Sequence, residues 1–284
     1  MASWIVILHW DEACCFSAEA DIKRFFSSLI GIPAFVIAMA GKKINWYKYA
    51  SPLAFYPLAG RMIPWFAIPA AILFVLGLYI GFFVAPTDFQ QGDVYRIIFI
   101  HVPAAWMGMF LYILLALYAG IGWAFNARLS SMMAASLSIT GAMFTFLALV
   151  TGSLWGKPTW GTWWVWDARM TSTLILLFLY VGFISLQAAI DDPRRADRAG
   201  ALLALVGVIN VPIIYFSVQW WNTLHQGATI RILNKPTIAP PMLAAMLIML
   251  VACWLYSIAV VLVRLRCIIL EREQNTASIA EAAV

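Results

Sequence analysis

Charged side chains are scarce in this sequence: they make up only 11% of its 284 residues, whereas 64% of the residues are hydrophobic. A soluble domain carries about 25% charged residues, because its surface must face water. The composition therefore excludes a soluble globular protein and predicts an integral membrane protein.

The sequence also lacks the patterns of several functional classes. Its four cysteines form no Cys-x-x-Cys pair, which argues against a zinc site or a disulfide framework. The basic residues form no stripe that would bind nucleic-acid phosphates. No phosphate-binding loop, Ser-His-Asp arrangement or carboxylate pair is present, so we expect neither ATP hydrolysis nor an independent catalytic activity.

Ionisable side chains are nearly absent from the long apolar runs, in which Asn210 and Pro212 are the main interruption. A transporter with an ion-coupled site at the membrane midplane usually carries charge within its spans. The sequence therefore argues against transport through this chain alone.

Six apolar stretches are long enough to cross a bilayer, for which a helix needs about 20 residues. They run roughly over 64–85, 99–125, 132–154, 169–190, 200–219 and 241–263. The predicted fold is an all-α integral membrane protein, a six-transmembrane-helix bundle.

The basic residues indicate the orientation of this bundle, because cytoplasmic loops are enriched in Lys and Arg. Most of the 18 basic residues fall on the side of the segment before the first helix. We therefore expect both termini to be cytoplasmic, with 273–284 as a cytoplasmic tail and outer loops at about 86–96, 155–168 and 220–240. The basic residues on the outer side are then Arg96, Lys157, Arg169, Arg231 and Lys235.

Residues 1–45 differ from the rest of the chain. Their apolar run, 26–40, is short for a span and contains Pro33, so it is more typical of an interfacial segment. If it did span, the count would become seven and the amino terminus would lie outside. Acidic residues precede it, where a secretory signal would be basic. We treat 1–45 as an extension or a wrongly assigned start, before a membrane domain at 46–272.

Tryptophan, by contrast, is abundant, with 14 residues in the chain. Trp220 and Trp221 begin the last outer loop, and five more lie in the loop 155–168, in the run Trp155-Gly-Lys-Pro-Thr-Trp160-Gly-Thr-Trp163-Trp164-Val-Trp166-Asp167. An aromatic belt at the lipid headgroups needs only one or two per helix end. Five in one loop, spaced by glycine and proline, favour a shaped surface for a large flat apolar ligand.

Two of the three histidines fall on the same outer side as this loop. His101 lies just above the second span and His225 lies in the last outer loop, while His9 belongs to the extension. Either alone is best interpreted as an interfacial polar residue, but the pair indicates a ligand site. A bare zinc or copper ion would need further ligands, and none stands out nearby. Haem fits both features, since its iron takes axial histidines and its macrocycle fits aromatic walls.

Asp167 is predicted to cap the fourth helix by accepting hydrogen bonds from the amides of residues 168–170. Such a cap would hold the tryptophan loop at a fixed angle. Haem propionates would need cationic partners among the five outer basic residues, and the sequence leaves open which of them serves.

The run Trp160-Gly161-Thr162-Trp163-Trp164-Val165-Trp166-Asp167 resembles the WGxxWxWD motif of the haem-handling, or WWD-domain, proteins of cytochrome c biogenesis. Segments 95–105 and 215–227 look like the two histidine segments of the CcmC group, the short members of that family. The resemblance covers roughly residues 46–272, including the order of six helices.

This resemblance implies that His101 and His225 are axial ligands of the iron of haem b, held as a transient ligand. It also implies that tryptophans of the motif line the haem edge. The candidate haem-binding residues are His101, His225, Trp155, Trp160, Trp163, Trp164, Trp166 and Asp167.

The resemblance further implies that haem is displayed on the outer, periplasmic face of the bacterial inner membrane to the haem chaperone CcmE, which takes it covalently. The small membrane protein CcmD and the ABC transporter subunits CcmA and CcmB are the other implied partners. Covalent attachment would be assisted by positioning more than by acid or base groups. Two alternatives stay open: a passive haem conduit across the membrane, and a structural membrane subunit of the transporter whose tryptophan loop docks a protein.

Overall fold

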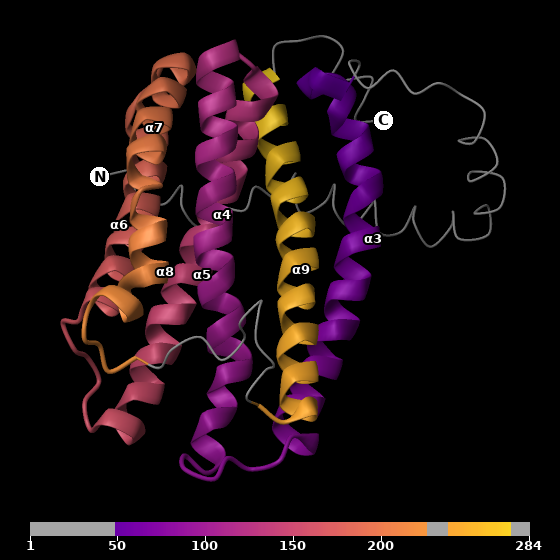
Figure 1. The fold of residues 1–284 in the computed structure, drawn as a ribbon. Coiled ribbons are helices and arrows are strands. Elements are labelled where there is room, and N and C mark those ends of the chain that lie inside the picture. Colours follow the sequence, from indigo (N-terminus) through magenta and orange to yellow (C-terminus); the bar gives the residue numbers. More distant parts are fainter. Residues whose placement is uncertain (1–48, 226–237, 274–284) are drawn as a thin grey trace, which may run out of the picture. The chain divides into compact units, whose positions relative to one another are not determined.

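The computed structural model of the chain describes residues 49–225 and 238–273, and within them the fold is all-helical apart from one isolated bridge between Asp88 and Gly92 (Figure 1). The elements in chain order are α3 (Pro52–Tyr79), the π-helix η3 (Ile80–Val84), the 3-10 helix η4 (Asp93–Ile97), α4 (Ile98–Phe125), α5 (Arg128–Trp160), α6 (Ala168–Ala189), α7 (Pro193–Gly207), α8 (Asn210–Trp220) and α9 (Pro240–Glu273).

Six helical stretches of the described residues are long and apolar enough to cross a membrane. They are Pro52–Val84, Asp93–Phe125, Arg128–Trp160, Ala168–Ala189, Pro193–Trp220 and Pro240–Glu273. The predicted all-α bundle with six spans is confirmed. Several helices are longer than predicted, because hydropathy locates only the part that crosses hydrocarbon, whereas the helices continue through flanking polar turns.

Helix α5 extends beyond its predicted end at residue 154 and reaches Trp160. Pro158 lies inside its last turns, where the Thr159 hydroxyl donates to the Trp155 carbonyl at 2.8 Å. Gly161 then ends the helix in the left-handed conformation (φ 79°), and its amide donates to the Lys157 carbonyl. The first part of the tryptophan loop is therefore helical.

The fifth span is two helices, α7 and α8, separated by a turn at Val208 and Ile209, and not one continuous helix over 200–219. Pro212 explains the break, because proline has no amide to donate to the Val208 carbonyl and its ring crowds that carbonyl. The Asn210 side chain reaches across to α6 and donates to the Ser172 carbonyl at 2.8 Å.

The chain divides into two compact units. The described part of the first comprises 49–67 and 258–273, where Ala59, Ile63 and Leu262 form a small core. In the same unit the Arg266 guanidinium lies 4.3 Å from the centre of the Tyr56 ring, an arrangement typical of a cation–π contact.

The second unit, 68–257, contains α4 to α8. In it α4 packs against α5 and α7, and α6 packs against α5, α7 and α8 (Figure 1). Small residues allow the close approach of α4 and α5: a Cβ on Gly108 would lie 2.6 Å from the Thr145 hydroxyl oxygen. The hydroxyl of Tyr180 on α6 donates to the Gly108 carbonyl at 2.7 Å and so links α6 to α4.

Candidate functional site

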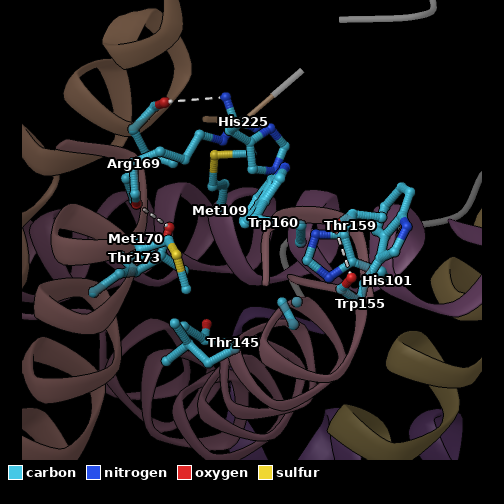
Figure 2. A pocket seen from close by; sticks show the side chains of 16 residues that line it. His101, Met109, Thr145, Trp155, Thr159, Trp160, Arg169, Met170, Thr173 and His225 are labelled. Carbon is cyan, nitrogen blue, oxygen red and sulfur yellow. Dashed lines mark hydrogen bonds between the residues drawn. The ribbon is translucent and has the colours of Figure 1, made fainter. Parts of the chain in front are cut away.

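A pocket opens among α4, α5, α6 and α8 in the second unit (Figure 2). Its empty space, including the part open to solvent, is about 860 Å³. Residues from each of these elements and from the segment after α8 form its wall, among them His101, Trp155, Trp160, Arg169, Ile214 and His225. Sequence-distant parts of the chain therefore meet at one cavity.

His101 lies in the first turn of α4 and is only 9% exposed. Its Nδ1 lies 3.0 Å from the hydroxyl oxygen of Thr151 on α5. That hydroxyl donates its one proton to the Leu147 carbonyl at 2.6 Å, so it can only accept from the imidazole. With the hydroxyl donating to Leu147, the tautomer of His101 that is protonated at Nδ1 satisfies this contact and would leave Nε2 to bind a ligand.

Two further contacts hold the His101 ring. A Cβ on Gly152 would lie 3.0 Å from the ring carbon Cε1, so glycine permits the close approach of α5 at this point. The Trp155 indole meets the imidazole edge-on, with ring centroids 5.7 Å apart. Trp155 is itself anchored, because its indole N–H donates to the side-chain oxygen of Gln91 at 2.7 Å.

His225 reaches the same place from the segment after α8. Its ring centroid lies 6.2 Å from that of His101, at an interplanar angle of 34°. Trp160, the last residue of α5, lies beside His225 with centroids also 6.2 Å apart. Of the candidate residues, the structure thus brings together His101, His225, Trp155 and Trp160, as Figure 2 shows.

The other candidate residues lie outside the pocket wall. Trp163 and Trp166 are exposed, at 53% and 75%, and Trp164 packs edge-on against Trp166. Asp167 caps α6 as predicted, with its carboxylate accepting from the Met170 amide at 2.8 Å. Together these residues form the turn between α5 and α6, in which Trp163 and Trp166 are exposed and Asp167 is buried.

The outer basic residues are distinguished by their contacts. Arg96 pairs with Asp93 at 2.9 Å and donates to the carbonyls of Gly81 and Ala85, so it binds the end of the first span. Lys157 donates to the carbonyl of Gly161. Among the described residues of this set, Arg169 alone lines the pocket, and it donates to the Ile214 carbonyl at 3.4 Å. Arg231 and Lys235, like His9, lie outside the described residues.

The sequence did not predict the small and hydroxyl-bearing residues that α5 contributes to the pocket. Thr145, Gly152 and Thr159 recur every seven residues, so they share one helix face, and all three line the pocket. A count of small and hydroxyl residues along this face would have located the wall. Thr151 and Gln91 carried no sequence signal, because their roles depend on contacts between distant segments.

Within the described residues, no group of three or more His, Cys, Asp or Glu side chains is placed to hold a metal ion. The imidazoles of His101 and His225 lie together at the pocket. Such a site suits a metal whose remaining ligands come from elsewhere.

Comparison with known proteins gives consistent matches over most of the chain. The family model CcmC, described as heme exporter protein C, matches residues 45–280. Heme exporter protein C of Escherichia coli is 46% identical over 235 residues, covering 83% of this chain and 95% of that protein. The protein of the same name from Bradyrhizobium diazoefficiens is 44% identical over 234 residues, covering 82% and 89%. A ccmC-like mitochondrial protein of cytochrome c biosynthesis from Marchantia polymorpha is 46% identical over 158 residues, covering 56% and 67%.

Proposed function

The chain belongs to the heme exporter protein C family, and on that premise we propose that it binds haem at the described pocket and presents it to the haem chaperone CcmE in the biogenesis of c-type cytochromes. The protein is a multi-pass protein of the bacterial inner membrane. The proposal places the pocket on the periplasmic face and both termini in the cytoplasm, because the basic residues favour that orientation.

The observation that carries the proposal is the 6.2 Å separation of the His101 and His225 ring centroids. A metal–imidazole bond is about 2 Å long, so two imidazoles that share one metal ion have centroids about 6 Å apart. The spacing of the two rings thus fits ligation of a single iron from both sides.

The two histidine side chains also fit haem as the ligand. When bound, haem supplies an iron with four ring nitrogens of its own and needs only axial ligands from the protein. His101 offers Nε2, because its Nδ1 proton is engaged by Thr151. The site thus needs no third or fourth protein ligand.

The pocket walls suit the rest of a haem molecule. Trp155 and Trp160 offer flat apolar surfaces next to the two imidazoles. Arg169 provides a cation on the wall, and a guanidinium binds carboxylates through charge-assisted hydrogen bonds. We assign the haem propionates to Arg169, since Arg96 is engaged at the end of the first span.

The exposed turn from Trp163 to Trp166 lies outside the pocket and offers apolar area to a protein. Exposed aromatic clusters are typical of interfaces. We assign this turn to contact with the chaperone CcmE, and propose CcmD, CcmA and CcmB as further partners in the membrane.

The test is the absorption spectrum of the purified protein beside its His101→Ala and His225→Ala variants, with His9→Ala as a matched control. We expect a bis-imidazole haem spectrum in the wild type and in His9→Ala, and its loss or conversion in the other two. An unchanged spectrum in both His101→Ala and His225→Ala would contradict the assignment of these histidines as ligands of the haem iron. Protein that lacks haem yet binds the chaperone would support a structural subunit instead.

A further inference from the structure

We propose that Thr151 is a positioning residue for His101: its hydroxyl accepts the Nδ1 proton, fixes the imidazole and makes its Nε2 a stronger ligand. This inference rests on the proposed ligation of haem by His101. It adds to the site a residue that lies outside the tryptophan motif in the sequence.

The direction of the hydrogen bonds carries the argument. Thr151 is buried, and its hydroxyl oxygen lies 2.6 Å from the Leu147 carbonyl one turn earlier on α5. A hydroxyl has one proton, and a carbonyl can only accept. The proton therefore points to Leu147, and the oxygen presents a lone pair to the His101 nitrogen 3.0 Å away. A chain of two hydrogen bonds runs from imidazole to hydroxyl to carbonyl, and each bond polarises the next.

Other threonines of α5 lack this second role. The Thr145 hydroxyl donates to its own helix, to the Gly141 carbonyl at 2.8 Å. The buried Thr140 hydroxyl has no hydrogen-bond partner among the described residues. A buried threonine on this helix therefore does not require a partner on another helix. The link from Thr151 to a residue 50 positions earlier in the chain is specific to His101.

A ligating histidine commonly donates its other ring N–H to an acceptor, which fixes the tautomer and raises the basicity of the ligand nitrogen. A more basic nitrogen stabilises the more highly charged ferric iron more than the ferrous iron. Loss of the Thr151 hydroxyl should therefore weaken binding of ferric haem more than binding of ferrous haem, and raise the midpoint potential.

The experiment compares Thr151→Val, which keeps the shape and removes the hydroxyl, with Thr151→Ser, which keeps the hydroxyl. Thr140→Val on the same helix is the matched control. We expect Thr151→Val to weaken ferric haem binding about tenfold relative to ferrous haem, which for a one-electron couple is about 59 mV of upward shift. Thr151→Ser and Thr140→Val should keep the wild-type potential.

A second measurement needs no haem. Nitrogen-15 NMR of the haem-free wild type, with the His101 signals identified by their absence in His101→Ala, should place the ring proton on Nδ1. A proton on Nε2, or a potential in folded Thr151→Val equal to that of the wild type, would overturn the inference. If Thr151→Val does not fold, a potential in Thr151→Ser shifted upward from the wild type also overturns it. Loss of the bis-imidazole assignment in the histidine variants would instead overturn the proposed function.

Discussion

The indole N–H of Trp155 donates a 2.7 Å hydrogen bond to the side-chain oxygen of Gln91, which ties the end of α5 to the segment between α3 and α4. The bond holds in place the indole that packs against His101. Gln91 is fixed in turn, since its backbone N–H donates to the Asp88 carboxylate at 2.8 Å. A loop residue outside the pocket thus anchors one of its aromatic walls.

Gln91→Ala should weaken haem binding, because it leaves the partly buried Trp155 N–H without its acceptor. Such a loss costs about 1–3 kcal/mol, equivalent to about a 5- to 150-fold fall in affinity if it appears in the bound state alone. Haem titration of the purified protein measures it, and Gln90→Ala serves as the neighbouring control. In a double-mutant cycle with Trp155→Phe, additive losses would contradict a direct coupling.

Arg169→Gln should weaken binding of haem about tenfold, because a charge-assisted hydrogen bond to a propionate is lost. The same variant should bind haem dimethyl ester as well as the wild type does, since the ester has no carboxylate to pair. Titration with both ligands checks this prediction. An equal loss for haem and its diester would show that Arg169 acts on the fold of the pocket and not on the propionates.

Arg96→Gln should lower thermal stability, because Arg96 donates to the carbonyls of Gly81 and Ala85 at the end of the first span. Hydrogen bonds from charged groups contribute about 1.5–3 kcal/mol each, and the exposed pairing with Asp93 adds little. Thermal unfolding in detergent measures the effect. If Arg96→Gln instead discriminated between haem and its diester, the assignment of the propionates to Arg169 would be wrong.

Gly152→Ala should disturb the His101 ligand without changing any polar group. The added Cβ would lie 3.0 Å from the imidazole Cε1, closer than real Cβ contacts normally allow, and Thr151 holds the ring on the same side. We expect weaker haem binding and a shifted absorption spectrum. Gly161→Ala, at the left-handed end of α5, is a control that should affect stability more than the spectrum. A wild-type spectrum in Gly152→Ala would contradict the close packing.

Trp160 and Trp166 should separate haem binding from haem transfer. Trp160→Ala removes a pocket wall beside His225, so bound haem should fall. Trp166 is 75% exposed and outside the pocket, so Trp166→Ala should keep haem and lose transfer to CcmE. Haem content by absorption and covalent haem on the chaperone are the two readouts. Loss of haem in Trp166→Ala would extend the binding surface to the exposed turn.

The six spans were predictable because bilayer thickness sets a minimum length for an apolar helix. The Asp167 cap was predictable for a similarly local reason, since a carboxylate just before a helix accepts from its first free amides. The convergence of His101 and His225 followed from counting spans, which puts both residues on one side. These features depend on the length, polarity and order of segments along the sequence, and not on contacts between them.

Other features depend on contacts that no local pattern records. The sequence made every tryptophan of the loop 155–168 an equal candidate for haem binding. In the structure helix α5 continues to Trp160, so that Trp155 and Trp160 lie on the pocket wall, whereas Trp163 and Trp166 lie outside it. Selecting Arg169 among the outer basic residues required knowing that Arg96 binds carbonyls from the preceding span. The contact of Thr151 with His101 depends on the packing of α4 against α5, which no local sequence pattern predicts.

The break between α7 and α8 determines the course of the chain that leads to His225. Asn210 binds the Ser172 carbonyl of α6, and Pro212 prevents α7 from continuing straight. Helix α8 starts afresh at this point and packs against α6. The proposed two-imidazole site therefore depends on the joint between α7 and α8, and substitutions at Asn210 or Pro212 are expected to shift His225 relative to His101 while every residue around the ligand stays intact.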